Sequence, residues 1–100
     1  MTLYFVLKGE WFDKIESGEK THEYRQAKQY WAKRITKILI WKLKHKEDLT
    51  IEFRRGYKKD APKLEAIISK VTFRLNGKET DLKYDGAVYD IEFRNVRRIA

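Results

Sequence analysis

The chain has 100 residues, of which 42% are hydrophobic and 14% aromatic, and its formal net charge is +8 at pH 7. These values predict one globular domain over residues 1–100 and exclude a disordered chain. The absence of cysteine excludes disulfides and cysteine-type zinc sites and agrees with a cytoplasmic location. No apolar run is long enough to span a membrane, and the excess of basic residues favours a polyanionic partner, most often nucleic acid.

The first quarter of the chain alternates between strand and helix signals. Residues 2–7 (TLYFVL) predict a strand. An apolar stripe predicts a short helix over residues 10–17, and Gly18 is expected to end it in the left-handed conformation. Residues 19–25 then alternate as a second strand with polar side chains on both faces.

A second helix is expected next, but its end is ambiguous. Residues 26–35 predict a helix, because Tyr30 and Arg34 form a pair at i, i+4. Residues 36–46 (TKILIWKLKHK) fit neither a helical nor a strand period cleanly. This lysine-rich segment either prolongs the helix or forms an exposed edge strand.

The remainder of the chain predicts strands. Residues 49–55 alternate well, and residues 63–75 form a long strand whose phase slip indicates a bulge near Ser69. Residues 76–77 (NG) are a strong turn signal, and residues 87–99 form the last strand. About five strands with two early helices predict an α+β domain built on a small curled sheet or barrel.

Several common chemistries are excluded by missing motifs. The chain has no glycine-rich phosphate loop of the nucleotide-binding types. Its two histidines, His22 and His45, lie on separate predicted elements, which argues against a metal site. No metal and no cofactor are therefore expected.

Polar and aromatic side chains gather after two of the predicted elements. The candidate ligand-binding residues are Lys20, Thr21, Glu23, Arg25, Trp31, Arg54, Arg55 and Tyr57. The cations would donate to phosphate groups, and the aromatic rings would stack on bases. Glu23 either forms a structural ion pair with Arg25 or Arg54 or accepts from a base amino group. Core packing is the alternative for Trp31, and an exposed strand end is the alternative for the two adjacent arginines.

Three segments carry a resemblance to a known family. They are WFDKIESGEKTHEYR (residues 11–25), YW with KR (residues 30–34) and EFRRGY (residues 52–57). In this order they resemble the ASCH domain family of the PUA-like superfamily, over residues 3–96. The resemblance implies a β-barrel of five or six strands with two helices packed beside it. It also implies a cleft lined by the G-x-K-T motif and RNA binding as the activity.

Other proteins similar to this family are hydrolases, either amidohydrolases of acylated cytidine or ribonucleases. In the amidohydrolases a lysine matching Lys20 acts with a threonine and a distant glutamate. Glu23 stands where that threonine would be, and a carboxylate cannot act as the same nucleophile.

Three functions therefore stay open. The first prediction is an RNA- or nucleotide-binding module with a basic cleft. The alternative is a small hydrolase that uses Lys20 and Glu23 as catalytic residues in the same cleft. The third is a protein whose basic face binds a protein partner.

Overall fold

The computed structural model describes residues 1–100 and has five strands and two helices. In chain order they are β1 (Thr2–Leu7), α1 (Gly9–Glu16), β2 (His22–Gln26), α2 (Gln29–Lys44), β3 (Thr50–Arg55), β4 (Lys63–Arg74) and β5 (Val88–Arg98). The predicted α+β class is confirmed, and each of the five predicted strands is present.

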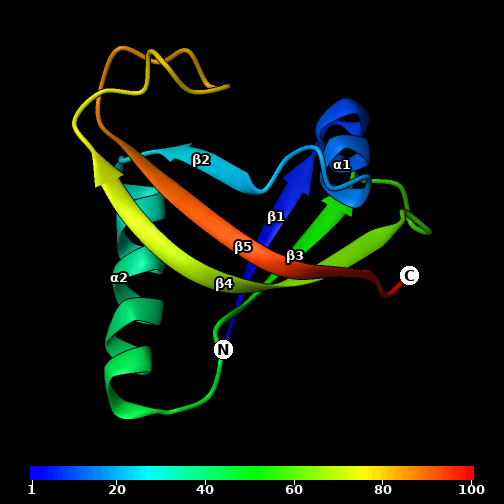
Figure 1. Ribbon diagram of the computed structural model, residues 1–100, viewed down its shortest axis with the longest axis horizontal. Helices are drawn as coiled ribbons and strands as arrows, with labels where there is room; N and C mark the ends of the chain where they lie inside the picture. The colour runs from blue at the N-terminus through cyan, green and yellow to red at the C-terminus, as the bar shows by residue number, and fades with distance from the viewer.

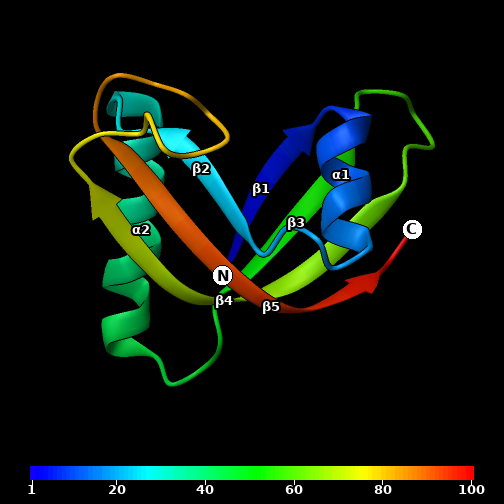
Figure 2. The ribbon, with the colours of Figure 1, turned by 45° about the horizontal axis from the view of Figure 1, so that its top comes forward.

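All five strands belong to one sheet in the order β1-β3-β4-β5-β2. β1 pairs with β3 in parallel, and the other pairs are antiparallel. The long strands β4 and β5 curl, so that the sheet forms a half-barrel with β1 and β2 at its two edges (Figures 1 and 2). The side chain of Arg25 on β2 reaches across to Phe5 on β1, with its guanidinium carbon 4.3 Å from the ring centre.

Two bulges interrupt the pairing of β4 with β5. One lies between Ile68 and Lys70 and confirms the predicted bulge at Ser69. The second lies on β5, where Asn95 adopts a left-handed conformation with φ of 57°. Bulges bend a strand and increase its twist, which accounts for the strong curl of this long pair.

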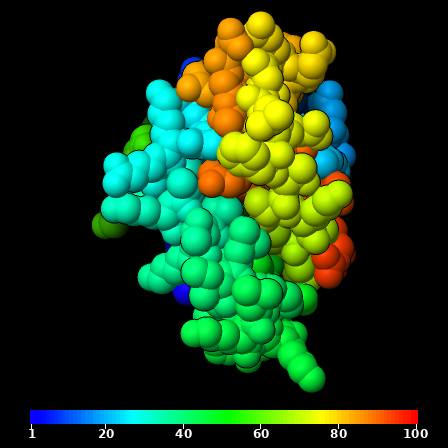
Figure 3. All heavy atoms as spheres, turned by 90° about the vertical axis from the view of Figure 1, so that its left-hand side faces the viewer, coloured from blue at the N-terminus to red at the C-terminus, as the bar shows by residue number.

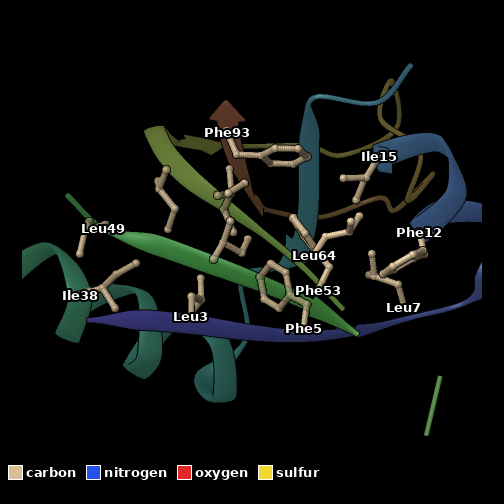
Figure 4. Close-up of a cluster of buried hydrophobic side chains, with 14 of the residues drawn as sticks. Leu3, Phe5, Leu7, Phe12, Ile15, Ile38, Leu49, Phe53, Leu64 and Phe93 are labelled. Atoms are coloured by element: carbon tan, nitrogen blue, oxygen red, sulfur yellow. The ribbon is translucent and has the colours of Figure 1, made fainter. Parts of the chain in front are cut away.

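The hydrophobic core fills the concave face of the half-barrel. Alternate residues of β1 and β3 point inward, and Phe12 and Ile15 of α1 and Ile35 and Ile38 of α2 complete the cluster. Figure 4 shows Phe5, Phe53 and Phe93 meeting in this cluster, with the α1 residues at one end and Ile38 at the other.

α2 resolves the ambiguous lysine-rich segment as helix. It continues to Lys44, so the edge-strand alternative for residues 36–46 is wrong. The expected start at residue 26 is also wrong, because Gln26 pairs with Val88 in the sheet and the helix begins at Gln29. The last turns of α2 extend beyond the sheet in both ribbon views (Figures 1 and 2).

Candidate functional site

A tight return of the chain after α1 positions Lys20. Gly18 ends the helix with φ of +85°, as predicted, and its N–H donates to the carbonyl of Ile15 at 3.1 Å. The N–H of Lys20 then donates to the carbonyl of Lys14 at 3.0 Å. This bond holds Lys20 against α1, and β2 consequently begins at His22 rather than at the expected residue 19.

Four charged side chains meet around Lys20, although Lys20 and Glu23 are only 8% and 6% exposed. The Nζ atom of Lys20 lies 3.7 Å from Oε1 of Glu23 and also contacts the carboxylate of Asp81. The Nη1 atom of Arg25 lies 3.4 Å from the same Glu23 oxygen. The expected ion pair between Glu23 and Arg25 is therefore present. Buried charges are tolerated when they are paired in this way.

Aromatic rings surround these cations. The Nζ atom of Lys20 lies 5.4 Å from the ring centre of Trp11 and 5.1 Å from that of Tyr24. The guanidinium carbon of Arg25 lies 5.4 Å from the centre of Trp31, which packs edge-on against Phe5 and the core. Cations held over aromatic faces are stabilised by the charge distribution of the ring.

Two cavities meet at Lys20. One has a volume of about 290 Å³ and is bordered by Thr21 and His22, and the other has about 200 Å³ and is bordered by Glu23 and Arg25. Both cavities share the side chains of Trp11, Lys20, Tyr24 and Asp81 as lining. The shared lining makes the two cavities neighbours, with Lys20 and Asp81 between them.

A third cavity, of about 500 Å³, lies beside the loop that follows β3. It shares Leu7 and Lys8 with the second cavity and is bordered by Arg55 and Tyr57. Arg55 forms two hydrogen bonds with the carboxylate of Asp13, at 3.1 and 3.2 Å. The ring of Tyr57 is exposed to solvent.

The structure thus distributes the eight candidate residues over this region. Six of them line one or more of the three cavities: Lys20, Thr21, Glu23, Arg25, Arg55 and Tyr57. The other two line none of them: Trp31 packs against the core, and Nη2 of Arg54 donates to the carbonyl of Lys58 at 2.6 Å.

A second polar network borders the first cavity. The carboxylate of Asp90 is buried, and its two oxygens lie 2.7 Å from Nδ1 of His22 and 2.9 Å from Nε of Arg74. The hydrogen bond with Asp90 raises the pKa of Arg74. Burial raises the pKa of Tyr24, and the negative charges of Asp90 and Asp81 raise it further. This network fixes the imidazole of His22 at the cavity wall.

Sequence patterns did not indicate two of these carboxylates. Asp81 lies in the polar connection between β4 and β5, which passes over β2 in Figure 2. Asp90 lies within a strand between two core-facing positions. Each contacts a residue more than 60 positions away in the chain, so local periodicity carries no signal for either contact.

Comparisons with known proteins leave the family open. No family model matches the chain, and no curated protein matches it.

The structure contains neither a group of metal ligands nor a helix that could cross a membrane. No three His, Asp or Glu side chains gather in a group that could hold a metal ion. Neither helix combines the length and the apolar character that crossing a membrane requires.

Proposed function

We propose that this chain is a PUA-like domain of the ASCH type that binds RNA or a nucleotide in the cavities around Lys20. The observation that carries the proposal is the position of Lys20, whose side chain borders two adjoining cavities and is packed between Trp11 and Tyr24. A cation flanked by aromatic rings suits a ligand that combines phosphates with bases.

Each lining residue has a role in this proposal. Lys20 contacts a phosphate, and the neighbouring Lys14 and Lys8 extend the positive surface along the cavities. Tyr57, exposed at the third cavity, stacks on a base. Glu23 holds Arg25 in place, with its Oε1 atom 3.4 Å from Nη1 of Arg25.

Fluorescence anisotropy tests the proposal, with short single- and double-stranded RNA and DNA titrated at two salt concentrations. We expect RNA to bind best and Lys20→Ala to weaken binding at least several-fold and to lower the salt slope by about one. Lys70→Ala is the matched control, because it removes the same charge from an exposed position on β4. Equal weakening in both variants would assign binding to the general positive surface and contradict the proposal.

A hydrolase is the second candidate function, and one observation favours it. Lys20 contacts two carboxylates, Glu23 and Asp81, beside a cavity, and such a group has the components of acid–base catalysis. The test is incubation with N4-acetylcytidine and with labelled RNA. A hydrolase would release product, and turnover would be lost in Lys20→Ala and in Asp81→Asn. A protein that only binds would give no turnover in any variant.

A further inference from the structure

The charge of α2 is unbalanced. The helix contains five basic residues and no acidic residue. Lys33, Lys37 and Lys44 are exposed, and none of the three forms an ion pair within the protein. Exposed lysines on other surfaces of a basic protein need no explanation, but these three follow one side of an apolar stripe.

That apolar stripe lies on the outer surface of α2 and is separate from the residues that face the core. It consists of Ala32, Leu39 and Leu43, with the hydroxyl-bearing Thr36 between them. The spacing of the four residues, by four, three and four positions, is that of a coiled-coil seam. Leu39 is 42% exposed and Leu43 is 88% exposed. Figure 3 views the molecule from this side and shows the cyan-to-green atoms of α2 lying uncovered on the surface.

A hollow on the same helix surface indicates the shape of an occupant. Its volume is about 490 Å³, and only α2 residues line it. The hollow is lined by Ala32, Lys33, Thr36, Lys37 and Ile40, so it lies beside the stripe and shares Ala32 and Thr36 with it. The last four of these residues stand at positions i, i+3, i+4 and i+7. Four residues with this spacing form the hole that receives one side chain, the knob, of a facing helix in coiled-coil packing.

We propose that α2 docks an amphipathic helix of a partner protein, with apolar side chains of the partner in the seam and acidic ones beside Lys33, Lys37 and Lys44. Charge complementarity selects this occupant. A second copy of the chain would oppose lysines to lysines, because α2 has no acidic residue. Nucleic acid would contact the lysines but would leave the apolar stripe uncovered. A flat lipid surface would leave the hollow unfilled.

Two synthetic peptides test the proposal, each about three heptads long with leucine at the a and d positions. One carries glutamate at e and g, and the other carries lysine there. Isothermal titration calorimetry gives the affinities, and amide NMR spectra of the labelled protein locate the contact. We expect the acidic peptide to bind at least tenfold more tightly than the basic one and to shift the resonances of Thr36, Leu39 and Leu43.

Two variants test the apolar stripe and the lysines beside it separately. Leu39→Ser combined with Leu43→Ser should lower the affinity for the acidic peptide at least tenfold. Leu75→Ser is the control, because Leu75 is about as exposed as Leu43 but lies directly after β4, away from α2 in the chain. Lys33→Glu combined with Lys37→Glu should reverse the preference between the two peptides.

Three results would overturn the proposal. The first is equal binding of both peptides, or binding of neither. The second is a dimer in analytical ultracentrifugation that the double serine variant abolishes, which would assign the seam to a second copy. The third is co-sedimentation with phosphatidylcholine–phosphatidylglycerol vesicles that the same variant abolishes, which would assign the seam to a lipid surface. None of these results depends on whether the cavities at Lys20 bind RNA.

Discussion

The Nζ atom of Lys20 lies 3.7 Å from Oε1 of Glu23, and both side chains are almost completely buried. This pair joins the return after α1 to β2, where Arg25 adds a second cation. The pair therefore affects the stability of the fold as well as the lining of the cavities, and the two effects are separable by experiment.

Glu23→Gln should destabilise the protein by about 2 kcal/mol, because it leaves the buried Lys20 and the partly buried Arg25 with one fewer counter-charge. The contact between Lys20 and Asp81 remains and limits the loss. Urea unfolding followed by circular dichroism measures the change. Glu19→Gln, at an exposed neighbouring position, is the control, and a loss no larger than that of the control would show that the buried pair contributes nothing.

Gly18→Ala should cost about 1 kcal/mol of unfolding free energy, because a β-carbon disfavours φ of +85°. No atom lies within 4 Å of the position that this β-carbon would take, so the cost comes from the backbone alone. Gly18→Asn should cost less, since asparagine adopts the left-handed conformation more readily. Thermal unfolding of the two variants tests this order, and a stabilised alanine variant would refute it.

The pair of Asp13 and Arg55 should make the stability of the fold depend on pH in the acid range. The hydrogen bond from Arg55 lowers the pKa of Asp13 below 3.8. The folded protein therefore binds that proton less tightly than the unfolded chain. The contribution of the pair to the free energy of unfolding is complete above pH 3.8. It disappears as the pH falls through the lower pKa of Asp13 in the folded state.

Asp13→Asn should accordingly lower stability slightly at neutral pH, and the difference from the original protein should vanish in acid. Unfolding curves over a pH series measure this difference. Because both side chains are exposed, added salt should reduce it as well. A difference that persists at a pH where Asp13 is protonated in the folded protein would mean that the carboxylate charge is not its cause.

Tyr24 should produce a loss of stability at alkaline pH. Burial, and then the charges of Asp90 and Asp81, raise its pKa above 10.0. The folded state therefore holds the phenol proton more tightly, and this contribution is present below pH 10 and lost as the pH rises through the higher folded pKa. Tyr24→Phe should remove the loss.

Ultraviolet absorbance at 295 nm follows the ionisation of the tyrosines as the pH rises. The titration curve of the original protein minus that of Tyr24→Phe isolates the contribution of Tyr24. The difference should show one phenol that titrates above pH 10. Asp90→Asn should move that titration to lower pH, because it removes a neighbouring negative charge. No movement would mean that the charge of Asp90 does not contribute to the raised pKa of Tyr24.

The features that the sequence predicted correctly are those set by neighbouring residues. Gly18 ends α1 because only the local backbone matters there. The bulge at Ser69 was visible because an extra residue reverses the alternation of apolar positions. The second bulge, at Asn95, left no such mark, because residues 94 to 98 are mostly polar and exposed.

The candidate site was predicted in part, for the same reason. Lys20, Glu23 and Arg25 meet because they are neighbours on one short segment. Asp81 was missed because it reaches Lys20 through a fold that joins distant parts of the chain. It was equally hard to predict that the helix continues through the lysine-rich segment to Lys44. α2 has apolar residues on its core-facing side and in a separate stripe on its outer surface, so the apolar positions together do not show one clear helical period.

The strand order has a consequence for how the protein is made. β2 carries the residues next to Lys20, and its only neighbour in the sheet is β5. During synthesis, β5 leaves the ribosome after every other strand, as the chain order requires. β2 therefore has no partner strand while β1, α1 and α2 are already available to fold. The wall that β2 gives to the cavities around Lys20 is fixed only after β5 has been synthesised.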